Sequence, residues 1–310
     1  MSSRISCWTV YEIMSQEGGH HMFKTLKKYR IPYLFISPFF ILFLVFQLIP
    51  IIWTGYISFT EWNGLGSPKW IGLDNYRLMV QDYMVSDALF NTVIYWLAGI
   101  VGILLFALMI ALCLNSDRLK FNKFFKTATF LPYVCASVAM GLIFGMLFDE
   151  NAGLINEILV LFGSGRIPWL TSSAYAKIPV IILFNWRITP WFTLIILSGL
   201  LNIPKEYYEA ATVDGANIIQ QFFFITIPLL RNIMFFCMLT ITVDTWKMFN
   251  ESYILAGPGS SNTSLFQLIY MSAFRTFKLG YASALSVILI LILLAISIVQ
   301  FVIRRRQGEV

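Results

Sequence analysis

Residues 279–303, LGYASALSVILILILLAISIVQFVI, indicate the class of fold most directly, and Arg304, Arg305 and Arg306 follow them at once. A helix needs about 20 mostly apolar residues to cross the hydrocarbon core of a bilayer, and this run is long enough. Its apolar residues do not alternate strictly with polar ones, as they would in a strand of a transmembrane barrel. We therefore expect a membrane-spanning helix that ends at a cluster of basic residues.

Five further stretches meet the same criterion of length and hydrophobicity. They are residues 33–59, 88–115, 126–148, 177–201 and 232–255. The chain of 310 residues is 58% hydrophobic and only 12% charged, whereas soluble domains carry about 25% charged residues. This composition excludes a soluble or disordered protein and predicts an all-α membrane protein with six transmembrane helices.

The distribution of lysine and arginine predicts how these helices are oriented. Basic residues concentrate before the first span at 24–30, between the second and third spans at 118–126, and after the last span at 304–306. Cytoplasmic loops carry the excess of such residues, so both termini are expected in the cytoplasm.

The same pattern divides the chain. We expect a cytoplasmic tail of residues 1–30, a transmembrane domain of residues 31–303, and a basic cytoplasmic tail of residues 304–310. Residues 1–22 are polar and mixed, unlike the rest, which suits either a tail or an extension upstream of the true start.

Several chemistries have no support in the sequence. The net charge of +6 lies in short runs between apolar stretches, whereas a nucleic-acid-binding domain would cluster it on one face. The two histidines, His20 and His21, are adjacent and outside the spans, and the four cysteines lack metal-ligand spacing. We expect no catalytic centre, no bound metal and no nucleic-acid partner.

The loop between the fourth and fifth spans, residues 202–230, is the most informative polar segment. Its sequence NIPKEYYEAATVDGANIIQQFFFITIPLL predicts a helix at Lys205–Val213, a stop at Gly215, and a second helix at 217–224 that ends before Pro228. Two small residues, Ala210 and Ala211, would let a partner approach this segment closely. Glu209 and Asp214 would offer hydrogen-bond acceptors to that partner.

Charged residues inside the spans form a second candidate site. Arg187 lies in the fourth span, and Asp244, Lys247 and Glu251 share one helical face of the fifth span at i, i+3 and i+7. Charges at membrane depth are costly and face either a partner charge or a polar cavity. Two interpretations stay open: an internal Asp244–Lys247–Glu251 ion-pair network, or a pocket for a polyhydroxylated ligand that also uses Trp191.

The loop carries a resemblance to a known family. Glu209-Ala210-Ala211, then Gly215, then Ile225-Thr226-Ile227-Pro228 is similar to the EAA signature of ABC importer permeases, EAA-x3-G-x9-I-x-L-P, and departs from it only at Ile227. Other segments resemble the carbohydrate-importing branch of that family: GLDNY at 72–76, Asn91-Thr92, GLINEIL at 153–159 and LGYASALS at 279–286. The turn AGPG at 256–259 departs from the T-x-G-G-P pattern usual in the family.

The resemblance implies a fold, partners and site residues. It implies the type I ABC importer permease fold, in a multi-pass protein of a prokaryotic cell membrane that imports a sugar. It assigns the docking of an ATP-hydrolysing subunit to a set of five residues: Glu209, Ala210, Ala211, Asp214 and Gly215. The chain has no phosphate-binding GxxxxGK[ST] loop, so ATP and Mg²⁺ would be used by two cytoplasmic partner subunits and no cofactor would be bound here.

The resemblance also implies a substrate site and further partners. By position it assigns substrate contacts to Arg187, Ile188 and Trp191 on the fourth span and to Asp244, Thr245 and Met248 on the fifth. Pro190 is expected to break the helix beside this pocket. A second permease, expected to be a paralogue, and an extracytoplasmic sugar-binding protein would complete the complex. A permease for another polar solute, such as a polyol phosphate, and an ATP-independent secondary carrier are the alternatives.

Overall fold

The computed structural model describes residues 30–116 and 121–306. The predicted tail before Arg30, the basic residues Arg118 and Lys120, and residues 307–310 lie outside the described residues. The chain divides into two compact units, residues 1–56 and 57–310, and each is described by itself.

The described part of the first unit is one long apolar helix. It consists of α2 (Arg30–Phe43), the π-helical turn η1 (Leu44–Leu48) and α3 (Ile49–Ile57), which follow each other without interruption. Residues Leu34–Ile57 are long and apolar enough to cross a membrane, which confirms the first predicted span. The most apolar part of this helix buries no residue within the chain, so its side chains need lipid or protein around them.

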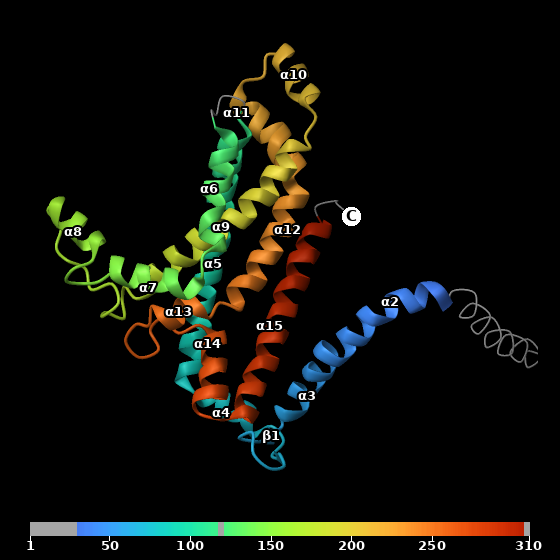
Figure 1. Cartoon of the computed structure of the whole chain (residues 1–310), viewed down its shortest axis with the longest axis vertical. Coiled ribbons are helices and arrows are strands. Elements are labelled where there is room, and N and C mark those ends of the chain that lie inside the picture. The colour runs from blue at the N-terminus through green and yellow to red at the C-terminus, as the bar shows by residue number, and fades with distance from the viewer. Residues whose placement is uncertain (1–29, 117–120, 307–310) are drawn as a thin grey trace, which may run out of the picture. The chain divides into compact units, whose positions relative to one another are not determined.

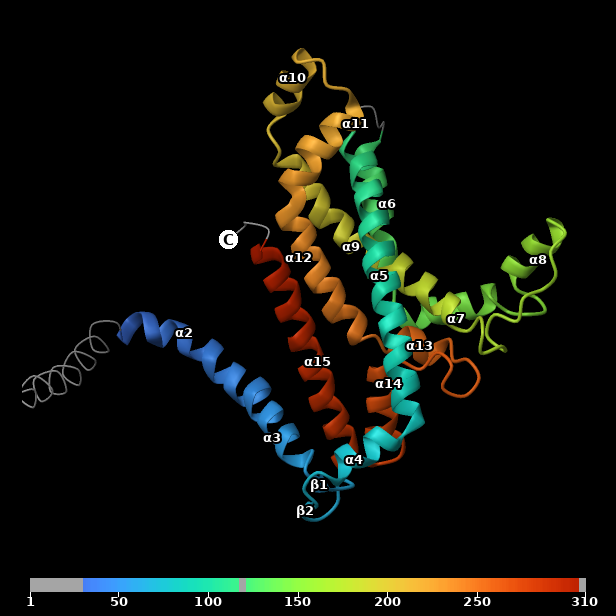
Figure 2. The same ribbon diagram turned by 180° about the vertical axis from the view of Figure 1, so that it is seen from behind.

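The second unit is a helical body in which long helices run side by side along one axis (Figures 1 and 2). Its helices are α4 (Asp74–Gln81), α5 (Tyr83–Asn115), α6 (Asn122–Val134), α7 (Ser137–Leu147), α8 (Leu154–Leu161), α9 (Lys177–Leu201), α10 (Lys205–Val213), α11 (Ile218–Gln221), α12 (Ile227–Trp246), α13 (Asn250–Ile254), α14 (Leu265–Tyr270) and α15 (Leu279–Arg306), with π-helical turns η2 (Phe222–Thr226) and η3 (Met271–Arg275).

One small sheet departs from the all-helical expectation. Strands β1 (Thr60–Glu61) and β2 (Lys69–Trp70) pair antiparallel, with Thr60 opposite Trp70. This hairpin lies with α4 at one end of the body, and α10 and α11 lie at the other (Figure 1). We call these two ends the hairpin end and the α10 end.

The membrane-crossing helices agree with the prediction except at the third and fifth spans. Within residues 30–116 and 121–306, five helices are long and apolar enough to cross a membrane. The third predicted span, residues 126–148, is instead two helices, Lys123–Val134 and Ser137–Leu147, that meet at 91°. The break falls at Cys135 and Ala136, whose ψ angles of 143° and 122° are far from helical values. Counting the bent pair as one span gives six.

Two predicted helix breaks at prolines are wrong. Pro190 lies inside the uninterrupted helix α9, and Pro228 lies at the first turn of α12, which continues directly from α11 and η2. A proline in the first turn loses no hydrogen bond, and the π-helical turn before Pro228 takes up the change in backbone pairing. The fifth span therefore begins much earlier than predicted, and the candidate span is Ile218–Ile254.

Close packing of α5, α9 and α12 forms the main core. Its fully buried side chains include Ile103 on α5, Ile196 on α9 and Ile241 on α12. Glycines let the backbones approach: a Cβ at Gly102 would lie 2.5 Å from Oδ1 of Asn185, across the α5–α9 contact. Small residues at helix contacts are typical of membrane proteins, where packing replaces the hydrophobic effect between helices.

Buried asparagines on α4 and α5 bind the backbone of two loops. Asn75 donates its amide to the carbonyls of Ser58 and Thr60, both at 2.9 Å. Asn91 donates to the carbonyls of Ser260 and Thr263 at 2.9 and 3.0 Å. The motifs GLDNY and Asn91-Thr92 thus have a physical role in this chain, because each satisfies loop carbonyls that would otherwise be buried without partners.

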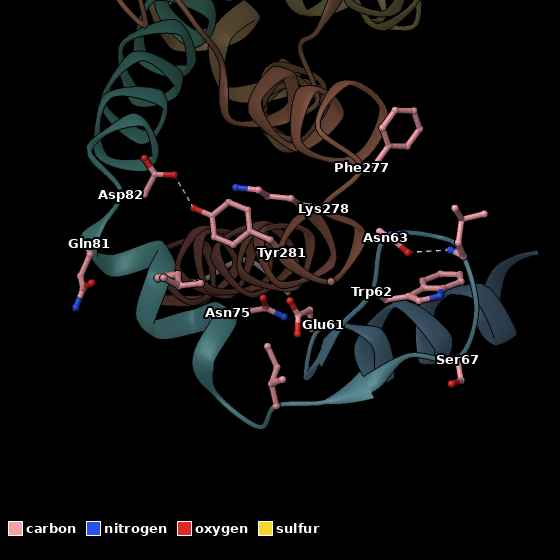
Figure 3. Close-up of a pocket in the computed structure, with 14 residues that line it drawn as sticks. Glu61, Trp62, Asn63, Ser67, Asn75, Gln81, Asp82, Phe277, Lys278 and Tyr281 are labelled. Atoms are coloured by element: carbon pink, nitrogen blue, oxygen red, sulfur yellow. Dashed lines mark hydrogen bonds between the residues drawn. The ribbon is translucent and has the colours of Figure 1, made fainter.

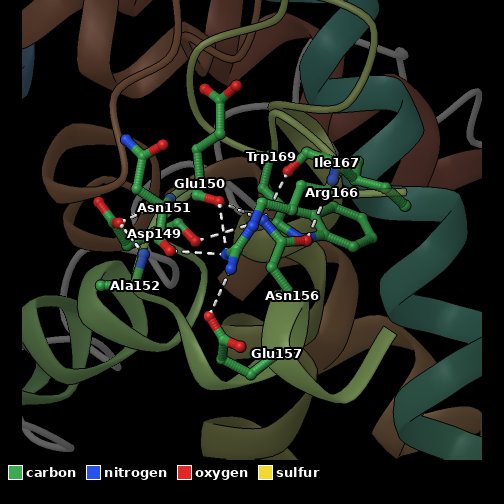
Figure 4. A network of polar contacts seen from close by, with 9 residues as sticks. All are labelled: Asp149, Glu150, Asn151, Ala152, Asn156, Glu157, Arg166, Ile167 and Trp169. Carbon is green, nitrogen blue, oxygen red and sulfur yellow. Dashed lines mark hydrogen bonds and ion pairs between the residues drawn. The ribbon is translucent and has the colours of Figure 1, made fainter. Parts of the chain in front are cut away.

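Asn156 does the same for the loop around α8 (Figure 4). Its amide nitrogen lies 3.0 Å from the carbonyl of Glu150 and 2.9 Å from that of Ile167. Its Oδ1 accepts from the indole N–H of Trp169 at 3.0 Å and from the backbone N–H of Ile167 at 3.1 Å. The short surface helix α8 and the segment after it are therefore joined through one fully buried side chain.

Candidate functional site

The α10–α11 segment, residues 204–226, is the first of two candidate sites. Helix α10 covers Lys205–Val213, as predicted, and ends at Gly215, which has a φ of +83°. The N–H of Ala216 donates to the carbonyl of Ala211 at 2.8 Å, and that of Gly215 to the carbonyl of Thr212 at 3.0 Å. This pair of bonds closes a helix C-terminus that needs a left-handed residue, for which glycine has no steric cost.

The second helix of the segment has its own cap. Asn217 accepts from the N–H of Gln220, and the Gln220 side chain accepts from the N–H of Asn217, both at 2.8 Å. Two side-chain bonds join the halves: Gln221 Nε2 to Thr212 Oγ1 at 2.9 Å, and Tyr208 to Thr226 at 3.0 Å between hydroxyls. The turn is therefore built from local bonds within the segment.

The five predicted docking residues lie on this turn and are exposed or half-buried. Glu209, Ala210, Asp214 and Gly215 are exposed, and Ala211 is half-buried. Exposed apolar neighbours surround them, namely Tyr207, Val213, Ile218 and Ile219. Contiguous exposed apolar residues on a polar loop are typical of a surface that binds another protein.

The second candidate site lies where α9 meets α13. Arg187 on α9 forms an ion pair with Glu251 on α13: Nη2 lies 2.6 Å and Nε 2.8 Å from the same carboxylate oxygen, Oε1. The Arg187 side chain is 19% exposed and that of Glu251 is 3% exposed. A buried carboxylate is tolerated in such surroundings only when a partner compensates its charge.

This pair corrects one of the two earlier interpretations. Glu251 does not belong to an Asp244–Lys247 network on one continuous helical face, because α12 ends at Trp246 and α13 begins only at Asn250. Lys247 is exposed at the end of α12. The half-buried carboxylate of Asp244 lies within electrostatic reach of both Lys247 and Arg187.

The six residues assigned to substrate by resemblance fall into two groups. Arg187 and Asp244 are half-buried, and Trp191 is exposed and stacks on Tyr133 of α6 with ring centroids 5.3 Å apart. The remaining three are buried in this conformation: Ile188 and Met248 pack into the main core, and Thr245 is fully covered beside Gly99. The structure therefore places three of the six where a ligand could reach them.

Some residues of this region escaped the sequence analysis. Tyr133 had no signal that would pair it with Trp191, since the two lie on different spans. Asn262 is buried, and its side-chain amide donates to the carbonyl of Leu255 at 2.5 Å. Its backbone carbonyl accepts from the hydroxyl of Tyr95 at 2.8 Å. The altered turn at 256–259 hid this role, although an asparagine in a small-residue loop is a common way to bind backbone groups.

A mixed polar pocket of about 790 Å³ lies at the hairpin end (Figure 3). Asp82 caps α5 by accepting from the N–H of Met84 at 2.9 Å and also accepts from the hydroxyl of Tyr281 on α15 at 2.8 Å. Glu61, Trp62 and further residues of the hairpin line the opposite side. The pocket thus lies between the hairpin, α4 and the start of α15.

The loop before α8 carries exposed charges around the Asn156 network (Figure 4). Arg166 pairs with Glu157 at 2.7 Å and donates to the carbonyl of Asn151 at 2.6 Å. The backbone N–H groups of Ala152 and Asn151 donate to Asp149 and hold the pKa of its carboxyl below the usual range. Among the residues that the structure describes, no cluster of His, Cys, Asp or Glu could hold a metal ion.

Fold and sites together define a multi-pass helical membrane protein with a charge pair inside its helical body and an exposed, self-capped helical turn at one end. The model of the family "Binding-protein-dependent transport system inner membrane component" matches residues 103–309. The chain belongs to this family, and its role is in transport.

Relatives match over most of their length. The probable ABC transporter permease protein YurN of Bacillus subtilis (strain 168) is 35% identical over 87% of this chain and 94% of its own. The arabinooligosaccharides transport system permease protein AraP of the same organism is 32% identical over 94% of both chains. The lactose transport system permease protein LacF of Rhizobium radiobacter is 32% identical over 89% of this chain and 94% of its own.

The fold has a counterpart among solved structures. A chain of a bacterial ABC transporter involved in the import of the acidic polysaccharide alginate superposes with a TM-score of 0.77. It is 22% identical, and the match covers 92% of this chain and 99% of that one. This likeness confirms the predicted fold, that of an ABC importer permease.

Proposed function

We propose that this chain is the permease subunit of an ATP-driven, binding-protein-dependent importer that moves a sugar across a prokaryotic cell membrane. Its family membership supports the transport role, and the names of AraP and LacF support a sugar as the transported solute. ATP and Mg²⁺ are used by two partner ATPase subunits, and this chain binds no cofactor.

The α10–α11 segment is the observation that carries the proposal. Its helix ends are satisfied by local bonds, yet Val213 and Ile218 remain exposed beside Glu209 and Gly215. A turn that is complete in itself and still presents apolar side chains is suited to insertion into a groove of another protein. We assign this groove to the ATPase subunit.

Orientation follows from the basic residues. Lys205, on α10, and Arg304–Arg306, at the end of α15, lie in segments that the positive-inside rule assigns to the cytoplasm. The α10 end would then face the ATPases, and the hairpin end would face an extracytoplasmic sugar-binding protein. Both termini of the chain are cytoplasmic in this arrangement, and a second permease, a paralogue, completes the pathway.

The chemistry around Arg187 favours a neutral sugar over a polyol phosphate. Glu251 already neutralises the guanidinium, so the pair offers hydrogen bonds without a net positive charge. Trp191, stacked on Tyr133, provides an exposed ring for the apolar face of a sugar. A phosphorylated solute would need a cation without a counter-charge, because an unpaired anion in low dielectric is costly, and the exposed Lys247 already has Asp244 within electrostatic reach.

Site-specific photocrosslinking tests the docking assignment. A benzophenone amino acid is placed at Val213, which is 87% exposed at the α10 end, and in a control at Phe162, which is 84% exposed after α8. The whole transporter is irradiated in native vesicles. We expect the ATPase subunit to be captured from Val213 and not from Phe162.

The same vesicles separate the proposal from a secondary carrier. Sugar uptake should require ATP inside and should stop when nucleotide hydrolysis is blocked. Uptake that continues without ATP, together with no ATPase capture from Val213, would overturn the proposal in favour of an ATP-independent carrier.

A further inference from the structure

An apolar groove of about 630 Å³ runs along the helical body between α5, α12 and α15. Its walls are mostly aliphatic and aromatic side chains, including Trp96, Phe235 and Ala295, with Arg231, Gln300 and Arg304 as the polar ones. Leu97, Val299 and Ile303 are exposed, so the groove lies on the surface of a membrane-spanning region. A groove of this size is typical of small-molecule sites.

Two arginines mark one end of the groove. Arg304 lies over the ring of Phe235, with Cζ 4.2 Å from the centroid, and donates to Oδ1 of Asn232. These contacts fix its guanidinium, but both partners are neutral, and Arg304 has no carboxylate partner among the residues described. Arg231 lines the same end. A positive charge held at the end of an apolar groove calls for an anionic group with an apolar tail.

A buried amide provides a second, independent observation. Gln300 lines the groove one helical turn before Arg304 and is more than nine-tenths buried. Its Nε2 donates to Thr242 at 2.9 Å, and the indole of Trp96 donates to the same hydroxyl at 3.0 Å. The Oε1 of Gln300 has no hydrogen-bond partner among the described residues. A buried acceptor without a partner is costly, and a ligand hydroxyl that displaces the protein atoms covering Oε1 would satisfy it.

We propose that the groove binds an anionic phospholipid with a hydroxylated headgroup, of the phosphatidylglycerol type. The phosphate lies against Arg231 and Arg304, a headgroup hydroxyl donates to Oε1 of Gln300, and an acyl chain fills the groove along α15. Basic pockets between transmembrane helices bind anionic headgroups in the same way. An apolar helix in the groove would leave the guanidinium of Arg304 uncompensated and Gln300 Oε1 without a donor, which argues for the lipid.

The test measures lipid binding to the purified, assembled transporter by native mass spectrometry. Phosphatidylglycerol and phosphatidylethanolamine are titrated in parallel. We expect a saturable phosphatidylglycerol adduct that Arg304→Gln weakens about fivefold, the factor that corresponds to about 1 kcal/mol for one basic side chain at an anionic surface. Arg305→Gln is the matched control, because Arg305 is exposed and does not line the groove.

A second variant tests the apolar part without changing charge. Ala295→Trp should fill the groove and abolish the adduct, whereas Ile298→Trp, at an exposed position outside the groove, should leave it unchanged. Equal binding of phosphatidylethanolamine, or a phosphatidylglycerol adduct that survives both Arg304→Gln and Ala295→Trp, would overturn the proposal. So would capture of a protein helix by a photocrosslinker at Ala295 in place of lipid.

Discussion

The Arg187–Glu251 pair and the α10–α11 segment both contain charged residues in a membrane protein, but their surroundings are opposite. Arg187 and Glu251 satisfy each other across two helices, with Glu251 almost completely buried. Glu209 and Asp214 on the α10–α11 segment are exposed. Arg187 and Glu251 compensate each other's charge within this chain. The α10–α11 segment instead exposes hydrogen-bond acceptors and apolar side chains.

The difference teaches how to separate structural residues from contact residues in such a protein. Where a polar group has its partner inside the chain, a substitution should be felt first in stability. Where the backbone is satisfied locally and the side chains are open, a substitution should be felt first in coupling to another protein. Each prediction below changes one side of this comparison and measures both outcomes.

The largest effect is expected at the buried pair. Arg187→Leu should lower the free energy of unfolding by about 3–5 kcal/mol, because it leaves the Glu251 carboxylate buried without a counter-charge. The double variant Arg187→Leu with Glu251→Leu should recover much of that loss. Unfolding by SDS titration in mixed micelles measures both, and equal losses in the single and double variants would contradict a direct pair.

Two glycines allow the same substitution on the two sides of the comparison. A Cβ at Gly199 on α9 would overlap the side chains of Ile233 and Leu230 on α12. Gly199→Leu should therefore cost about 1–3 kcal/mol through overpacking. The same micelle titration tests it, with Ser198→Leu, at an exposed neighbouring position, as the control.

Gly215→Leu should behave differently. Nothing lies within 4 Å of a Cβ at this position, so the only internal cost is the left-handed backbone, about 1–2 kcal/mol confined to the turn. We expect normal amounts of protein in the membrane, but uncoupling of ATP hydrolysis from sugar uptake. Gly215→Asn, which tolerates positive φ, should retain more uptake; wild-type uptake in Gly215→Leu would refute the assignment.

Two tryptophans of α9 allow a test of the proposed substrate contact. Trp191 and Trp186 are 40% and 42% exposed, but only Trp191 is assigned to substrate. Trp191→Ala should raise the sugar concentration for half-maximal uptake about threefold to tenfold, the worth of one aromatic contact. Trp186→Ala is the control, and equal shifts in both variants would indicate a general packing effect.

The smallest effect concerns Asp149. Because backbone N–H groups hold its pKa below the usual value in the folded state, its ionised form stabilises the fold above the unfolded-state pKa of about 3.9. That contribution is lost as the pH falls through the lower, folded-state pKa. Thermal melting of wild type and Asp149→Asn should differ slightly at neutral pH and converge in acid; a constant difference would contradict this.

Most of the spans and the end of α10 could be predicted because they depend on local sequence. Length and hydrophobicity determine a membrane helix, and Gly215 after Lys205–Val213 determines a helix end, whatever surrounds them. The proline breaks were wrong for the opposite reason. Whether Pro190 interrupts α9 depends on how neighbouring helices satisfy the freed carbonyl, which a single sequence does not contain.

The interaction partners of the buried polar groups could not be predicted from the sequence either. Helical spacing placed Glu251 beside Lys247, but the break after Trp246 turned it towards Arg187, which lies 64 residues earlier in the sequence. Likewise, the sequence did not indicate that three of the six assigned substrate residues, Ile188, Thr245 and Met248, are buried in this conformation. Position within a helix predicts which residues share a face, whereas the identity of the facing residue is a property of tertiary packing.

The uninterrupted path from α11 through η2 to α12 has a mechanical consequence. It begins next to the self-capped turn and ends at Trp246, a few residues before Glu251. A hydrogen-bonded helix is stiff along its axis, so a displacement of its α11 end would be carried along α12 to Trp246. Such a displacement would reach the Arg187–Glu251 ion pair only through the three residues between α12 and α13, so this short break decides how much of the movement is passed on.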